Sequence, residues 1–123
     1  MVLFYLAIGG VLGVWARYGL TKAVQSVFSG EFPLGTLVVN VLGSFILAFL
    51  FVETLERLTL PPAVRTGILT GGIGAFTTFS TFMVETLTLL EEGETGKAAA
   101  YLALSIVLGL VAAFGGVYLS RNL

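Results

Sequence analysis

The sequence predicts an all-α membrane protein, a single transmembrane domain of four helices over residues 1–123, with a break near the middle of the third helix. Composition indicates this class, because 57% of the residues are hydrophobic and only 11% are charged, against about a quarter charged in a soluble domain. The mean hydropathy is +1.03. Each span takes roughly 20 apolar residues, so the chain accommodates four spans with short connections. The break is predicted from a glycine-rich stretch, Gly71 to Phe82, inside the third apolar segment.

The composition also excludes most kinds of active site. The chain has no cysteine and no histidine, which removes disulfides, thiolate and imidazole metal ligands and the commonest acid–base residue. A net charge of −1 indicates no nucleic-acid partner. The first apolar segment lacks a basic n-region and a small-residue cleavage site, so we expect a membrane span there and not a signal peptide. Neither an enzyme activity nor an organic cofactor is expected.

The first span is predicted from residue 2 to about residue 24. Gly9 and Gly13 lie four residues apart, which lets another helix approach closely. Arg17 follows at roughly 22 Å along the helix, at 1.5 Å per residue, and is therefore near the far membrane interface. Its long side chain either snorkels there as an anchor or has a functional role.

The second span is predicted from Pro33 to about Leu55. Thr36, Asn40 and Ser44 are spaced at i, i+4 and i+8, which places three hydrogen-bonding side chains on one helix face. An amide in hydrocarbon needs a partner, and a bond between helices is the ordinary explanation. The alignment of all three residues favours a polar track along this face.

The third span is predicted from about Ala63 to Leu90 and contains the break. Glycine in a helix interior costs about 1 kcal/mol relative to alanine, and Gly71, Gly72 and Gly74 fall within four positions. Backbone groups freed by a break must be buried in protein or must line a cavity or an ion site. The stretch is therefore the first candidate for a functional site.

Aromatic and hydroxyl side chains alternate after the glycines. A phenylalanine stripe by itself is usually packing or lipid-facing surface, but here hydroxyls interrupt it. The rings are Phe76, Phe79 and Phe82, and the hydroxyls are Thr78, Ser80 and Thr81. Glu85 follows, and an ionisable residue at this depth is a functional-site hypothesis unless it reaches the wet interface.

The fourth span is predicted from about Ala98 to Leu119, after an acidic loop. Tyr101, Ser105 and Gly109 are spaced at i, i+4 and i+8, which gives a second polar track on a second helix.

The positive charges do not choose an orientation. Four spans place Arg57, Arg65 and Arg121 on one side of the membrane and Arg17, Lys22 and Lys97 on the other. Orientation follows the bias in Lys and Arg between the two sides, and here the numbers are equal. We therefore expect insertion in both orientations and an antiparallel, dual-topology homodimer.

The motifs in these spans resemble the CrcB/Fluc fluoride channels over essentially the whole chain. The residues that carry the resemblance are Gly9-Gly10, Gly13 and Ala16-Arg17-Tyr18; Pro33-Leu34-Gly35-Thr36-Leu37-Val38-Val39-Asn40 and Gly43-Ser44-Phe45; and Gly71-Gly72 with Thr77-Thr78-Phe79-Ser80-Thr81-Phe82.

The resemblance implies passive fluoride export across the inner (plasma) membrane of a prokaryote, by a lipid-embedded antiparallel homodimer with two pores. It implies a fluoride path lined by Asn40, Phe79 and Phe82, with hydroxyls along it and polar residues near its aqueous end. The further members are Thr36, Thr78, Thr81 and Ser105, with Glu85 and Tyr101 at the end. A structural sodium ion at the dimer centre is implied on the backbone carbonyls of Gly74 and Thr77, and Arg17 matches a family arginine without an assigned role.

The residue types suit a fluoride path. Hydroxyls and the asparagine amide donate hydrogen bonds, and an aromatic ring has a positive edge that faces an anion favourably. Contacts that are individually weak let the ion leave as well as enter.

Two other hypotheses compete with the fluoride channel. A small multidrug-resistance-type proton-coupled antiporter also has four helices, but it needs a carboxylate deep in the membrane, typically in the first helix. Here the first span has no acid and Glu85 is the only candidate. The other hypothesis is a non-conducting scaffold subunit, in which the glycines serve only to pack the helices together.

Overall fold

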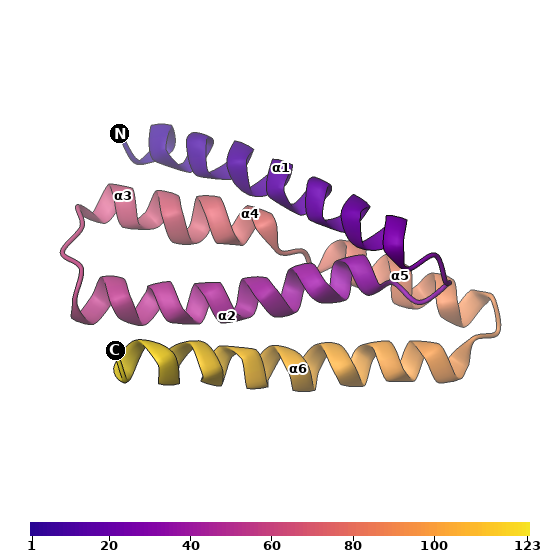
Figure 1. The fold of residues 1–123 in the computed structure, drawn as a ribbon. Helices are drawn as coiled ribbons and strands as arrows, with labels where there is room; N and C mark the ends of the chain where they lie inside the picture. The colour runs from indigo at the N-terminus through magenta and orange to yellow at the C-terminus, as the bar shows by residue number, and fades with distance from the viewer.

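The computed structural model describes residues 1–123 as helices joined by short connections, arranged as four antiparallel segments (Figure 1). All four segments are long and apolar enough to cross a membrane, which confirms the predicted all-helical class with four candidate spans. Their elements are α1 (Val2–Val27), α2 (Leu34–Glu56), the third segment with α3 (Pro62–Thr66), η1 (Gly67–Ile73), α4 (Gly74–Phe76) and α5 (Ser80–Glu91), and α6 (Thr95–Arg121). Both termini and the α2–α3 connection lie at one end of the bundle.

The third segment is helical through its glycines. Element η1 is a π-helix, and α4 continues it from Gly74 to Phe76. Thr77 then has extended backbone angles, φ −88° and ψ 163°, and α5 begins only at Ser80. The non-helical residues 77–79 therefore lie within the predicted stretch from Gly71 to Phe82, but they come after its glycines, which are helical.

The glycines instead let α1 lie directly against the third segment. A Cβ atom on Gly9 would overlap the carbonyl oxygen of Gly67, and one on Gly13 would overlap the carbonyl oxygen of Gly72. Small residues that allow two backbones to touch are typical of helix packing in membranes. These residues thus determine how closely α1 and η1 approach.

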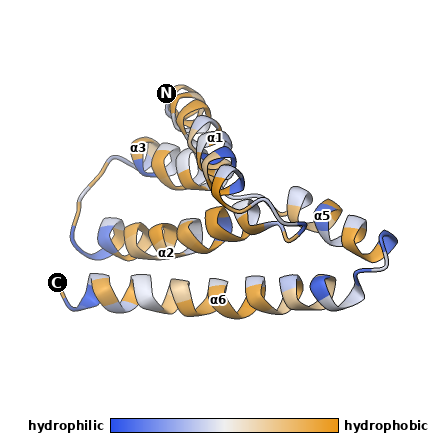
Figure 2. Cartoon of the chain, turned by 45° about the vertical axis from the view of Figure 1, so that its right-hand side comes forward, coloured by the Kyte–Doolittle hydropathy of each residue, from blue (hydrophilic) through white to orange (hydrophobic).

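Helices α2 and α6 form the other close pair and run side by side along their length (Figures 1 and 2). Gly116 of α6 fits against the backbone of α2, where a Cβ would overlap the carbonyl oxygen of Phe45. Figure 2 shows hydrophobic residues along the spans and hydrophilic residues mainly at their ends. This distribution matches helices that face hydrocarbon between two wet interfaces.

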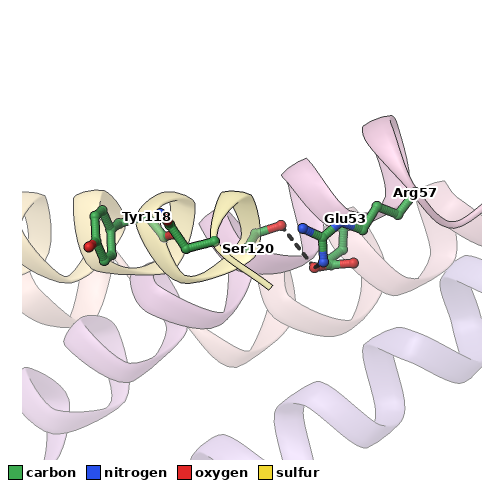
Figure 3. A network of polar contacts seen from close by, with 5 residues as sticks. Glu53, Arg57, Tyr118 and Ser120 are labelled. Atoms are coloured by element: carbon green, nitrogen blue, oxygen red, sulfur yellow. Dashed lines mark hydrogen bonds and ion pairs between the residues drawn. The ribbon is translucent and has the colours of Figure 1, made fainter.

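A polar cluster joins the ends of α2 and α6 beside the carboxyl terminus (Figure 3). Ser120 Oγ donates a hydrogen bond of 3.0 Å to Glu53 Oε1, and Arg57 Nη1 lies 3.3 Å from the same oxygen. The carboxylate of Glu53 is nearly buried but paired, which is how a buried charge is normally accommodated.

Candidate functional site: a polar passage at the helix interruption

Asn40 holds the interruption in the third segment. Its Nδ2 donates to the carbonyl oxygen of Thr78 at 2.8 Å, and its Oδ1 accepts the Thr78 backbone N–H at 2.8 Å. Both backbone groups of Thr78, which lies between α4 and α5, are therefore satisfied by one side chain of α2. An asparagine amide has two N–H donors, so one of them is left for another acceptor.

The first cavity, of about 250 Å³, lies beside this pair of hydrogen bonds. It combines polar side chains with two aromatic rings, as the sequence predicts for Asn40, Thr78, Phe79 and Phe82. The full lining is Asn40, Gly43, Ser44, Leu47, Thr77, Thr78, Phe79 and Phe82.

The two rings of this cavity differ in burial. Phe82 is buried at 8% exposure, whereas Phe79 is 72% exposed. They meet edge to face, with ring centroids 6.1 Å apart and planes at 85°. Phe82 in turn meets the ring of Tyr101 at 4.9 Å and 84°. Phe82 is thus fixed in the core of the chain, whereas Phe79 projects from it.

A second cavity, of about 350 Å³, adjoins the first and shares Thr78 with it. Its lining is mainly polar and includes both signs of charge. It consists of Val14, Arg17, Tyr18, Thr21, Lys22, Gln25, Thr36, Val39, Thr78, Thr81 and Glu85. Neither cation in this lining forms an ion pair with a carboxylate of the chain, so the α1 wall of the cavity is electropositive.

A third cavity, of about 380 Å³, lies at the loop end and shares Gln25 and Glu85 with the second. Its other charged lining residues, Glu31 and Glu92, are acidic. The three cavities are therefore neighbours that share lining residues, and they follow one another from the interruption to the end of the bundle. Glu85 lies where the electropositive cavity meets the acidic one.

Tyr101 and Ser105 of α6 are placed differently with respect to these cavities. Tyr101 is fully buried, and its hydroxyl donates to Glu85 Oε1 at 2.8 Å. Ser105 lines none of the three cavities. Its Oγ is nevertheless buried without a hydrogen-bond partner, and such groups are uncommon and need an explanation.

The backbone oxygens at the interruption are available to a ligand. No hydrogen bond formed by a side chain, or by the backbone outside the regular helices, ends on the carbonyl oxygen of Gly74 or Thr77. Oxygen atoms of this kind are the ligands that hard cations prefer, so the donor type at these two positions fits such an ion.

Helix α1 contributes more residues to the second cavity than Arg17, the only one predicted from the sequence. Thr21 and Gln25 also line the second cavity, and with Arg17 they are spaced at i, i+4 and i+8. This is the spacing that identified the tracks of α2 and α6, and it was available in the sequence. Lys22 gave no such signal, because it falls outside this spacing.

The fold is that of a multi-pass membrane protein, and its three neighbouring cavities, together called the passage below, are partly aromatic and partly polar. The family model described as CrcB-like protein, Camphor Resistance (CrcB), matches residues 4–117. The chain belongs to this family, which confirms the resemblance noted in the sequence.

Curated relatives match nearly the whole chain and carry the name of an ion channel, not of an enzyme. "Fluoride-specific ion channel FluC" of Acidithiobacillus ferrooxidans (strain ATCC 53993 / BNL-5-31) is 52% identical over 118 residues, which cover 96% of this chain and 94% of the relative. The protein of that name from Magnetococcus marinus is 44% identical over 121 residues, 98% of each chain. That from Aquifex aeolicus is 42% identical over 122 residues, covering 99% and 98%.

Proposed function

We propose that this protein is a fluoride-selective channel that lets fluoride leave the cytoplasm passively across the inner membrane of a prokaryote. The observation that carries the proposal is the row of neighbouring cavities that begins at the helix interruption, where amide, hydroxyl and aromatic-edge groups meet. That the ion is fluoride is inferred from the names of the relatives, which are 42–52% identical to this chain.

Each group along the passage offers fluoride a replacement for water. The second N–H of Asn40 and the hydroxyls of Thr78 and Thr81 are donors. Phe79 and Phe82 offer positively polarised ring edges. Ser105 of α6 lies outside the three cavities, and its hydroxyl, which has no partner within the chain, is assigned to the path only by the resemblance. No single contact is strong, so the ion binds well enough to enter and weakly enough to leave.

We infer that the working unit is an antiparallel homodimer with two pores. Phe79 projects from its own chain with 72% of its surface exposed, which leaves it free to complete a passage in a second copy. The Lys and Arg residues are divided equally between the two ends of the helix bundle, and this balance favours neither orientation in the membrane. A reporter fused to the carboxyl terminus should therefore be found on both sides of the membrane, and a single side would contradict this inference.

A structural sodium ion is part of this proposal. Backbone oxygens of Gly74 and Thr77 from both copies would hold it, and its charge would lower the cost of an anion nearby. The purified protein should have a higher melting temperature in sodium chloride than in N-methylglucamine chloride of equal ionic strength. Equal melting temperatures in the two salts would contradict the assignment.

Fluoride efflux from liposomes, followed with a fluoride-selective electrode and without a proton gradient, tests the main proposal. We expect fluoride release by the wild-type protein and its loss in Phe82→Ile. Phe114→Ile is the matched control, because Phe114 is 75% exposed and lines none of the three cavities. Release no faster than from protein-free vesicles would refute the channel.

The proton-coupled antiporter is the alternative function. Its only support in the passage is Glu85, which accepts a hydrogen bond from Tyr101 and lines two cavities. Exchange of a cationic drug for protons, with no fluoride release, would replace the channel by this alternative.

A further inference from the structure

Arg65 is the one cationic side chain that neither pairs with a carboxylate nor lines the passage. The chain has six Lys and Arg residues. Three of them form ion pairs, and two line the second cavity. The sixth, Arg65, lies in α3 at the opposite end of the bundle, next to the end of α2.

The guanidinium of Arg65 is held in one orientation by α2. Its Nε donates to Thr54 Oγ1 at 2.8 Å, and its Nη2 donates to the carbonyl oxygen of Phe51 at 3.4 Å. The group also lies over the ring of Phe51, 4.9 Å from the centroid. A guanidinium has five N–H donors, so donors remain after these bonds, and the order already imposed reduces the entropy lost on binding a ligand.

The position of Arg65 is at the edge of the membrane. It is the fourth residue of the third segment, which begins at Pro62, and is thus about 5 Å from the helix end at 1.5 Å per residue. Exposed apolar side chains flank it on α2 and η1: Phe51 at 49%, Leu55 at 66% and Ile68 at 38% exposure. A fixed positive charge at headgroup depth therefore adjoins apolar surface.

We propose that Arg65 binds the phosphate of a glycerophospholipid whose acyl chains lie along Phe51, Leu55 and Ile68. The planar fork of arginine matches phosphate oxygens in pairs, and the charge of Arg65 is not neutralised within the chain. The inference rests on the membrane location of the protein and not on the ion that it transports.

Arg121 supplies the matched control. It lies at the same end of the bundle, but its Nε is 3.8 Å from Glu56 Oε1, so its charge already has a partner. Arg57 is likewise paired, with Glu53 (Figure 3). If positive charge at this end were sufficient for lipid binding, Arg65→Gln and Arg121→Gln would behave alike.

Native mass spectrometry of the detergent-purified protein, titrated with dioleoylphosphatidylglycerol, tests the proposal. We expect Arg65→Gln to weaken phospholipid binding about tenfold, in line with roughly 1.5 kcal/mol for a hydrogen bond to a charged group. Arg121→Gln should bind as the wild type does, and Arg65→Lys should lie between. Dioleoylglycerol, which has the same acyl chains and no phosphate, should bind as weakly to the wild type as the phospholipid binds to Arg65→Gln.

Several results would overturn the assignment. They are unchanged phospholipid binding by Arg65→Gln, equal binding of dioleoylglycerol and phospholipid, and displacement of the lipid by millimolar inorganic phosphate, which would indicate a free-anion site. Dissociation of Arg65→Gln into monomers would show that a second copy covers Arg65. If Arg65→Gln does not fold, Arg65→Lys and the dioleoylglycerol comparison decide.

Discussion

The two halves of the third segment differ in backbone structure and in what their residues contact. From Gly67 to Gly74 the segment is helical and places backbone against α1, with glycines at the points of closest approach. From Thr77 to Glu85 it leaves the helix, regains it, and lines three cavities with hydroxyls, rings and a carboxylate. Both halves depart from regular α-helix, as a π-helix and as an interruption, but only the second lines the three cavities described above.

This difference shows that glycines in a membrane helix and an interruption of that helix are separate structural features with separate causes. A glycine permits close packing through its missing Cβ, whereas an interruption needs polar partners for the freed backbone groups. Here the partner is Asn40 on α2. Five substitutions, each with a comparison variant, test whether the halves are as distinct as the structure indicates.

Asn40→Ala should have the largest effect, because Asn40 both bonds the interruption of the third segment and lines the first cavity. It leaves the Thr78 N–H and C=O without their partner, at about 1–3 kcal/mol for each unpaired group. We expect about 2–5 kcal/mol of lost stability by chemical denaturation in micelles, and fluoride efflux reduced to background. Asn122→Ala is the control, because Asn122 is exposed at the carboxyl terminus. A fully stable Asn40→Ala protein would show that the interruption does not depend on α2.

Gly13→Ala should disturb the packing of α1 against the first half of the third segment. The added Cβ would overlap the carbonyl oxygen of Gly72, whereas one on Gly10 would meet nothing within 4 Å. Overpacking typically costs about 1–3 kcal/mol, so the melting temperature should fall for Gly13→Ala, whereas for Gly10→Ala it should stay the same or rise, because alanine is the better helix former. Equal melting temperatures for the two variants would contradict the close packing of α1 on η1.

The sequence predicted the class of fold better than the local geometry. Hydropathy determines four spans because the membrane demands long apolar segments. The spacing of Thr36, Asn40 and Ser44 predicted a polar face, and all three residues line cavities together with residues of the third segment. The position of the interruption relative to the glycines was not predicted correctly. The cost of glycine in a helix takes no account of a neighbouring helix that packs into the space left by the missing Cβ atom. That neighbour, α1, is known only once the chain is folded.

The two phenylalanines of the first cavity should separate stability from transport. Phe82→Ile changes a buried ring and should lower both stability, by about 1–1.5 kcal/mol, and efflux, by at least tenfold. Phe79 is 72% exposed, so Phe79→Ile should stay within about 0.5 kcal/mol of the wild type and still reduce efflux. Denaturation and electrode measurements on the same preparations test this. Normal efflux by Phe79→Ile would mean that the projecting ring takes no part in the passage.

Lys22→Gln should have the smallest effect and one that depends on salt. Lys22 lines the second cavity without a carboxylate partner, so its charge raises the local concentration of anions. Because the Debye length falls from about 30 Å at 0.01 M to about 10 Å at 0.1 M ionic strength, efflux should fall a few-fold at the lower salt and little at the higher. Lys97→Gln is the control, since Lys97 is paired with Glu31 at 3.1 Å and should show no such dependence on salt. If the two lysine variants respond alike, the electropositive wall of α1 does not guide the ion, and the polar half of the third segment acts alone.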